Sequence, residues 1–523
     1  MAILKANPTS LAGHMKNAKP GDEIELASGR YAGLFTTGAP GAANARITLR
    51  AAQGAEPIFS GADNSVASIV VNQPYWSLED ILIEPTAKPN SAKPVWLNIR
   101  PGGAHAIVRR VTLARDADVK AVKPWNDFGI VVAGDHVLLE DVRAFGMVKG
   151  IQIQGGCIRP RLRRCHVGPT YQSTVVVTTS YGIVRGADID LCRLEDSYIE
   201  DAIQWMHNYD LTGDARIADV SALGTIVRRT VMRGCNENAL DFKGAGLVVV
   251  DGCHISRMAG SNDGPLAGWN YNAVAAVTRG SGASCDNILL RNTTIEECAS
   301  GVRLLPSNWT IIHNDIQDNN WRPERSDYAG FGIRAPGGAR GASIINNAIG
   351  GHLGGNIIAP DGIEFINNPT EAGLPAYPLT ETRSAGSGIV VPLGNARYFT
   401  DWFGLTDIPL DRIVIGGQLA LVTAVNYANQ TVTLDRPLQW DDRATVYLGS
   451  DRAVTGVLPD YSQIDGPDPE PDDPDEPPIT EPDEGDAWEA GHSLTLTGPA
   501  PAIATIRELV QALGGLSIKD NEK

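Results

Sequence analysis

The segments Leu78–Ile83, "LEDILI", and Val108–Leu113, "VRRVTL", share a pattern that returns along much of the chain. Both six-residue boxes are apolar at their ends and polar at the second and third positions. Three of the nine intervals between box ends span 21 to 23 residues, and the others are longer. A coil of fixed circumference that carries loop insertions gives such spacing. The box recurs at eight further places, which end at Ala144, Val167, Ile199, Met232, Ile255, Ile295, Ile316 and Ile349.

Equivalent positions of the boxes hold similar side chains. The fourth position is small or β-branched in the first eight boxes, and Cys235 and Cys298 both lie three residues beyond a box. Like residues recur in this way when successive turns stack, because one turn cannot bury its apolar face alone. A rung of about 22 residues with three short strands predicts an all-β fold, a right-handed single-stranded parallel β-helix of about ten or more rungs. The leucine-rich-repeat signature is absent, and propeller blades are longer than these rungs.

The remaining segments predict parts at both ends of this coil. Residues 1–60 are expected to form an N-terminal cap and the first rungs, with Leu11, Met15 and Ala18 on one face of a short capping helix. Residues 61–370 are expected to form the β-helix, and 371–460 a small C-terminal β region. Residues 461–487 read as an acidic Pro-rich linker. Residues 488–523 read as a docking or oligomerisation segment with a short helix whose apolar face holds Ile503, Ile506, Leu509, Val510 and Leu513.

Composition excludes several classes of function. The net charge is −17, but 11 acidic residues lie between Asp465 and Asp486, so the rest of the chain carries only −6. The net charge argues against nucleic acid as a partner, whereas the near balance of the remaining chain leaves room for a local basic surface. Seven cysteines without CxxC spacing predict neither a disulfide framework nor a zinc site. The chain has no apolar run long enough for a membrane span, and its first residues lack the apolar core of a standard signal peptide. If the chain works outside the cell, we expect it to leave by a route other than the standard signal peptide.

The stretch Asn236–Gly244, "NENALDFKG", is the candidate site. Strand side chains alternate between faces, so Asp241 and Lys243 are expected to point outward together. Counting back from the box ends predicts that one outward column of the coil is basic, and Arg279 joins it if the register slips by one residue. A basic column of this kind would form a groove for an anionic or hydroxyl-rich polymer. Its expected members are Arg100, Gln154, Lys243, Arg303 and Arg334.

These features resemble a known group of proteins. The segment "AKPGDEIELASGRYAG" (residues 18–33), the boxes and the lysine-bearing strand are similar to β-helical polysaccharide lyases and to the depolymerase spikes of phage tails, over roughly Met1 to Leu458. The resemblance implies that Lys243 abstracts the proton beside a uronate carboxylate and that Arg279 or Arg303 supplies a neighbouring cation. It also implies that Glu237 and Asp241 could bind Ca²⁺. Without a bound Ca²⁺, Asp241 opposes the role of Lys243 as a base, because a neighbouring carboxylate favours the charged form of lysine.

Other chemistries stay open at this point. Hydrolysis would need two carboxylates, which Asp241 could supply with Glu237 or with Asp201; β-elimination is the favoured reaction. The candidate substrate-binding residues are Arg100, Gln154, His207, Trp269, Tyr271 and Arg334. The favoured hypothesis is a trimeric phage tailspike that binds, and could cleave, host cell-surface polysaccharide, attached to the virion through its C-terminal segment. The alternatives are a bacterial lyase acting on a uronate polymer and a non-catalytic adhesin or structural protein.

Overall fold

The structure is a computed structural model that describes most of the chain up to residue 449. The described residues are 1–61, 68–85, 94–115, 118–119, 126–178, 184–206, 224–243, 246–258, 272–276, 287–304, 309–320, 330–335, 341–359, 363–368, 378–405 and 408–449. Met1–Gly466 forms one compact unit. The expected acidic linker and terminal helix lie outside the described residues.

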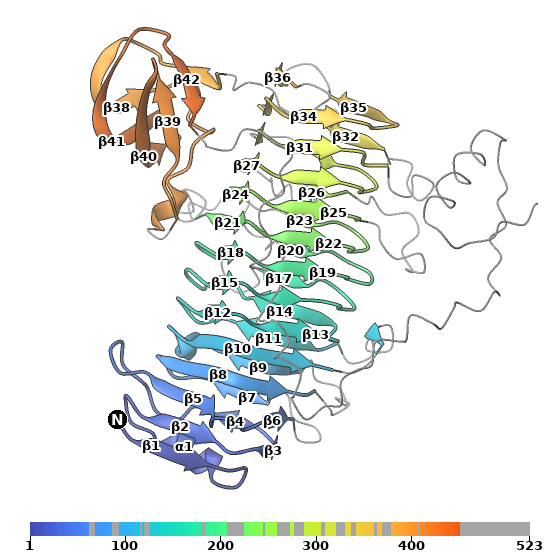
Figure 1. The fold of residues 1–523 in the computed structure, drawn as a ribbon, viewed down its shortest axis with the longest axis vertical. Helices are drawn as coiled ribbons and strands as arrows, with labels where there is room; N and C mark the ends of the chain where they lie inside the picture. The colour runs from blue at the N-terminus through green and yellow to red at the C-terminus, as the bar shows by residue number, and fades with distance from the viewer. Residues whose placement is uncertain are drawn as a thin grey trace, which may run out of the picture. The chain divides into compact units, whose positions relative to one another are not determined.

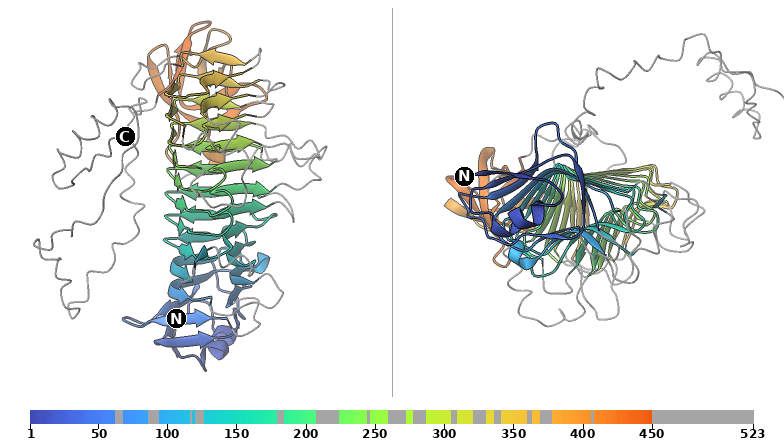
Figure 2. Two further views of the ribbon diagram at one scale, coloured as in Figure 1. Left: turned by 90° about the vertical axis from the view of Figure 1, so that its right-hand side faces the viewer. Right: turned by 90° about the horizontal axis from the view of Figure 1, so that it is seen from below.

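Most of the described chain winds as a right-handed parallel β-helix whose coils contribute strands to three parallel ladders (Figures 1 and 2). The sequence prediction of this fold is confirmed. One ladder is a twelve-stranded sheet, which we call the site sheet. Its strands are β4 (Phe35–Thr36), β7 (Ile69–Val71), β9 (Val95–Ile99), β11 (Phe128–Val132), β14 (Lys149–Ile153), β17 (Val175–Thr178), β20 (Ile203–Met206), β23 (Leu240–Lys243), β26 (Val274–Ala276), β29 (Val302–Arg303), β32 (Phe331–Arg334) and β35 (Gly355–Ile358).

The other two ladders belong to one 24-stranded sheet, joined because β8 and β10 each run through both. The first ladder holds β1 (Ile3–Ala6), β2 (Glu23–Leu26), β5 (Ile47–Ala51), β8 (Trp76–Ile83), β10 (Ile107–Ala114), β12 (Leu138–Glu140), β15 (Arg161–Arg163), β18 (Asp188–Asp190), β21 (Thr225–Arg228), β24 (Val248–Asp251), β27 (Ile288–Arg291), β30 (Thr310–Ile312), β33 (Ser343–Ile345) and β36 (Glu364–Ile366). The second continues from β3 (Gly29–Ala32) and β6 (Pro57–Ser60) through β13 (Arg143–Phe145), β16 (His166–Val167), β19 (Arg193–Glu195), β22 (Val231–Arg233), β25 (His254–Ser256), β28 (Thr294–Glu296), β31 (Asp315–Gln317) and β34 (Ala348–Gly350).

The predicted boxes fall in register, with one exception. Leu113 pairs with both Ile83 and Ala144, and the other box ends continue this column. The box placed at Leu194–Ile199 is wrong, because Val167 pairs with Leu194, which pairs in turn with Met232. The box of that coil is Ile189–Leu194, "IDLCRL". The sequence pattern missed this box because the segment that starts at its last residue, "LEDSYI", begins with the same three letters as "LEDILI".

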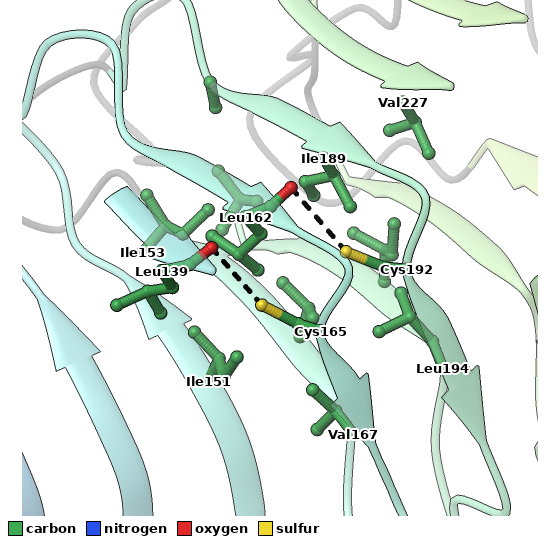
Figure 3. Close-up of a cluster of buried hydrophobic side chains, with 14 of the residues drawn as sticks. Leu139, Ile151, Ile153, Leu162, Cys165, Val167, Ile189, Cys192, Leu194 and Val227 are labelled. Atoms are coloured by element: carbon green, nitrogen blue, oxygen red, sulfur yellow. Dashed lines mark hydrogen bonds between the residues drawn. The ribbon is translucent and has the colours of Figure 1, made fainter. Parts of the chain in front are cut away.

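The box positions have distinct structural roles. The first, fourth and sixth positions point inward and form the core, as Leu162, Cys165 and Val167 do (Figure 3). Each such buried aliphatic side chain contributes about 2 kcal/mol. The Cys165 thiol donates to the Leu139 carbonyl oxygen at 3.5 Å, and the six described cysteines are buried and free. The third position turns the corner with a positive φ, as at Arg164 (φ 50°).

The second box position points outward, and its charge alternates from coil to coil. From Lys5 to Asp251, each residue in this column pairs with a residue of opposite charge in the next coil, and the alternation ends where Arg291 pairs with Ile312. We call it the alternating column. Its members are Lys5, Glu25, Arg50, Glu79, Arg109, Glu140, Arg163, Asp190, Arg228, Asp251 and Arg291.

The two ends carry the other parts. Helix α1 (Leu11–Asn17) lies at the N-terminal end, where Leu11 and Met15 are fully buried, as predicted for a cap. Past the β-helix, a six-stranded antiparallel sheet forms the predicted C-terminal β region. None of the described helices has the length and apolar character needed to cross a membrane. In order across the sheet, the strands are β37 (Thr380–Glu381), β42 (Thr445–Leu448), β39 (Arg412–Ile415), β40 (Gln418–Asn426), β41 (Thr431–Trp440) and β38 (Gly386–Pro392).

Candidate functional site

Strand β23 divides its side chains between the core and the outward face of the site sheet. Leu240 and Phe242 point inward and are fully buried, and the Phe242 ring lies 4.6 Å from that of Trp205. Asp241 and Lys243 alternate with them and therefore share the outward face. Both are nevertheless shielded from water, since Asp241 is 0% and Lys243 7% exposed. A shielded ion pair on an outward face is more than a solvated surface contact.

Two neighbouring coils bring three carboxylates together beside Lys243. Asp201 comes shortly before β20, Glu237 comes shortly before β23, and Asp241 lies within β23. Gln204 of β20 pairs with Asp241, so the coil stacking places residues 37 positions apart next to one another. Carboxylate oxygens of the three acidic residues all lie within 4.8 Å of each other. We call these three residues the carboxylate cluster.

Amide donors hold Asp201 in place. Its Oδ1 accepts hydrogen bonds from the Asn238 backbone N–H at 3.0 Å and from Asn238 Nδ2 at 2.9 Å. Its Oδ2 accepts one from Gln204 Nε2 at 2.8 Å. Burial, followed by the charges of Glu237 and Asp241, nevertheless raises the pKa of Asp201 well above its ordinary value. The buried surroundings of Asp201 and the neighbouring carboxylates thus favour its protonated form.

Asp241 has an unusual environment. Its Oδ2 contacts the Lys243 ammonium, but among the described residues neither carboxylate oxygen accepts a hydrogen bond of good geometry. Burial acts to lower the pKa of Lys243, yet the charges of Asp201 and Asp241 together outweigh it and raise this pKa above the ordinary value. Lys243 is consequently an ammonium ion and not a base in this state. The structure thus shows the effect expected of Asp241, which stabilises the charged form of Lys243.

The cluster has the donor set of a divalent cation site. Three carboxylates supply the hard oxygen ligands that Ca²⁺ prefers, and Asp241 presents two buried oxygens that accept no hydrogen bond of good geometry from the described residues. The residues thus fit the expected Ca²⁺ at Glu237 and Asp241 and add Asp201 to it. Sequence reasoning considered Asp201 only for hydrolysis. The matched spacing of Asp201 to Ile203 and of Asn238 to Leu240 could have placed it, because Ile203 pairs with Leu240.

The expected basic column is split into two. Gln154 and Lys243 belong to one column. The strand after that of Gln154 contributes Thr178, which pairs with Met206, and Met206 pairs with Lys243. Arg303 instead pairs with Ala275, which pairs with Asp241, so Arg303 lies two residues out of register with Lys243. Counting back from the boxes failed because the segment between this strand and the next box varies in length. All these residues still occupy the outward face of the site sheet, since a shift of two preserves the face.

The described members of the two columns differ in exposure. Arg100 follows β9 and is exposed, whereas Gln154 is half-buried. Arg303 and Arg334 pair with each other and are half-buried, and the Arg334 guanidinium lies 5.2 Å from the centre of the Phe331 ring. His207, Trp269, Tyr271 and Arg279 lie outside the described residues, so their roles stay predictions.

Comparison with known proteins finds similar solved structures but no similar sequence. No protein-family model matches the chain, and no curated protein is similar to it in sequence. Among solved structures, a mannuronic acid-specific polysaccharide family 6 lyase from human gut microbiota covers 72% of this chain and 89% of its own, with 10% identity and a TM-score of 0.46. Pectate lyase Pel9A covers 69% and 78% at 13% identity and a TM-score of 0.32. The Dettilon tailspike protein covers 84% and 89% at 12% identity and a TM-score of 0.40.

These likenesses concern the fold alone. The resemblance to lyases and tailspikes read from the sequence is confirmed as a likeness of fold. Activity has to be argued from the side chains, because one fold carries many chemistries.

Proposed function

We propose that this protein binds a uronate-containing polysaccharide along the outward face of the site sheet and cleaves it by β-elimination. The observation that supports this most directly is the contact between Lys243 and the carboxylate cluster on an outward strand. A tailspike-like depolymerase of host surface polysaccharide is the favoured setting. A secreted lyase would use the same site.

The reaction assigns a defined task to Lys243. As a neutral amine, it takes the proton from the carbon that bears the uronate carboxylate. The electron pair of that C–H bond forms a double bond with the adjacent ring carbon, whose bond to the glycosidic oxygen breaks. The oxygen takes a proton from the Lys243 ammonium formed in this step, or from water, and leaves as a hydroxyl group. A divalent cation held by the carboxylate cluster would cancel the negative charge that keeps Lys243 protonated and would withdraw charge from the uronate carboxylate.

The arginines offer further contacts to an anionic chain. Arg303 lies two coils beyond Asp241 in the same column, or about 10 Å along the β-helix. Arg334 follows one coil later. Guanidinium groups bind carboxylates through paired hydrogen bonds. The two arginines are therefore placed to bind successive carboxylates of one polymer that runs along the coil axis.

Hydrolysis is the second candidate, and one observation favours it. The pKa of Asp201 is raised, which favours the proton-donating form of this residue beside a second carboxylate. Paired carboxyl groups of this kind cleave glycosidic bonds with water. The full burial of Asp201 argues against direct contact with a sugar, which is why elimination ranks first.

The test is a panel of uronate polymers incubated with the protein, with Ca²⁺ or with a chelator. Ultraviolet absorbance from an unsaturated uronate is the expected product signal, and new reducing ends without it would indicate hydrolysis. Lys243→Gln should abolish the signal, whereas Lys149→Gln, at the start of β14 in the same sheet, should retain it. Because the pKa of Lys243 is raised, residual activity without Ca²⁺ should increase with pH. Binding without any cleavage would favour the adhesin.

A further inference from the structure

The C-terminal β region is joined to the β-helix around one buried arginine. Arg291 ends β27 on the outward side of the coil and is 2% exposed. Its Nη1 and Nη2 donate to the two carboxylate oxygens of Asp411, each at 2.8 Å. Asp251 of the preceding coil lies 3.5 Å from Nη2, and the guanidinium lies 5.0 Å from the centre of the Trp402 ring. An ion pair thus links a loop of the C-terminal region to the outward side of the coil.

Apolar side chains surround this ion pair. Outward residues of three coils, Ile226, Val249 and Ile312, belong to the same buried cluster as Phe399 and Trp402 of the C-terminal region. The cluster is separate from the core inside the β-helix. The junction can therefore open without unwinding the coils.

His313 lies beside this junction without a hydrogen bond. It follows Ile312, which pairs with Arg291, and it is 7% exposed. Neither ring nitrogen has a partner among the described residues, and the same holds for Nε of Arg291 and Nε1 of Trp402. Native interiors seldom leave buried polar atoms unpaired. Four such atoms in three neighbouring side chains mark a junction that is weaker than its ion pair suggests.

The charges around His313 disfavour its protonation. Burial and then the positive charge of Arg291 lower the pKa of His313 from 6.5 to about 4, against a smaller opposing effect of Asp251. Asp411 faces the group from the C-terminal region, but both its oxygens are engaged by Arg291. His313 is therefore neutral while the junction is closed at neutral pH.

We propose that the junction is an acid-sensitive latch, in which protonation of His313 releases the C-terminal β region from an intact β-helix. A protonated ring would place a second positive charge next to Arg291, without an acceptor for either N–H among the described residues. Detachment would relieve both penalties, because it exposes the imidazolium to water. This device is independent of the function proposed above and rests on different residues.

The direction and size of the effect follow from linkage. A histidine whose pKa is lowered in the closed state makes no difference above pH 6.5, and it favours the open state increasingly as the pH falls toward 4. With an ordinary pKa after release, the ratio of open to closed molecules should rise about 30-fold between pH 7.5 and pH 5.

Amide hydrogen exchange of the full chain tests the latch. Protection of the backbone around residues 396–411 should fall as the pH drops to 5, after correction for the intrinsic exchange rate, while residues 128–153 of the coil keep theirs. His313→Asn should reduce the 30-fold change to less than about threefold. Asparagine suits the position, because Asn292 and Asn346 occupy the same column with φ of 51° and 56°.

Further variants separate the latch from general acid effects. His313→Gly is a second neutral replacement, since Gly252 has a φ of 64° in this column. His254→Asn removes a histidine that pairs with Glu296 elsewhere, and it should behave as the unmodified protein. Asp411→Asn should open the junction already at pH 7.5. The latch is refuted if protection survives to pH 5 in the unmodified protein, or if both His313 variants lose it at the same pH.

Discussion

Asn347 illustrates how one side chain holds three coils together. Its Nδ2 donates to the carbonyl oxygens of Ile311 and Ile345 and to Asn368 Oδ1, at 2.9 to 3.1 Å. Its Oδ1 accepts from the backbone N–H and the Nδ2 of Asn314, at 3.0 and 2.9 Å. Each side-chain amide thus hydrogen-bonds to groups of the coil before it, and the amide of the coil after it accepts a hydrogen bond from it. A buried ladder of this kind needs every member.

Asn347→Ala should consequently lower the free energy of unfolding by about 3 kcal/mol, since it leaves several buried groups unpaired. Asn347→Thr is the matched variant, because Thr230 and Thr293 occupy the same box position and keep a hydroxyl there. It should cost less. Urea denaturation followed by circular dichroism measures both. Equal stability of the alanine variant and the unmodified protein would contradict the ladder's role.

The site was predictable only as far as local rules reach. Alternation along a strand placed Asp241 and Lys243 on one face, and charge reasoning anticipated their conflict. Asp201 could not be assigned to the cluster from its own surroundings, because its contacts depend on which residue of the next coil it meets. That register depends on insertions between boxes, such as the one within the 38-residue interval from Leu194 to Met232. Such insertions also displaced Arg303 and Arg334 from the expected column.

At the scale of the strand, charge alternation selects the neighbour of each coil. In the alternating column, Arg109 lies between Glu79 and Glu140, and it bonds Glu140 at 2.8 Å. The corner residues next to it repeat the rule, since Arg110 bonds Asp80 and Arg164 bonds Asp141. Single exposed ion pairs contribute little. A whole column of ion pairs instead makes any arrangement in which a coil stacks one coil out of place less stable, because like charges would then be adjacent.

Coil deletion tests this selection. Removing residues 114–144 takes out one coil and stacks Arg109 on Arg163, whereas removing 114–167 takes out two and stacks Arg109 on Asp190. The shorter protein should have the higher Tm, because the single deletion adds like-charge contacts worth about 2 kcal/mol. Scanning calorimetry compares the two.

A charge-neutral form of the single deletion is the control. Arg163→Gln with Arg164→Gln in that background should recover most of the lost stability, since it removes the repulsion and leaves the junction sequence otherwise intact. A single deletion as stable as the double one, before any such change, would show that charge has no part in stacking.

The elements themselves were predictable because the box encodes a whole corner of the coil. Apolar first, fourth and sixth positions with a charged pair between them occur in "LEDILI" and in "VRRVTL" alike. The misplaced box at Leu194 shows the limit of this rule. The letters there match the box pattern, but the strand pairing does not follow them. Leu162 pairs with Ile189, which aligns the buried Cys165 with the buried Cys192 and makes Ile189–Leu194 the box.

At the scale of the whole molecule, the charge is divided between parts with different tasks. The residues from Asp465 to Asp486 hold 11 acidic and no basic residues, which favours an extended, solvated segment. The region before it is nearly balanced and presents arginines on the site sheet.

The segment beyond the acidic linker is expected to bring chains together. Ile503, Ile506, Leu509, Val510 and Leu513 form one apolar face of a predicted helix. A helix this short is marginal alone in water, so it needs a partner surface, and a second and third copy of itself are the simplest partners. Sedimentation velocity should therefore report a trimer for the full chain and a monomer after removal of 487–523. Leu509→Glu with Leu513→Glu should dissociate the full-length trimer without shortening the chain, and a monomer at all concentrations before any change would exclude this assembly.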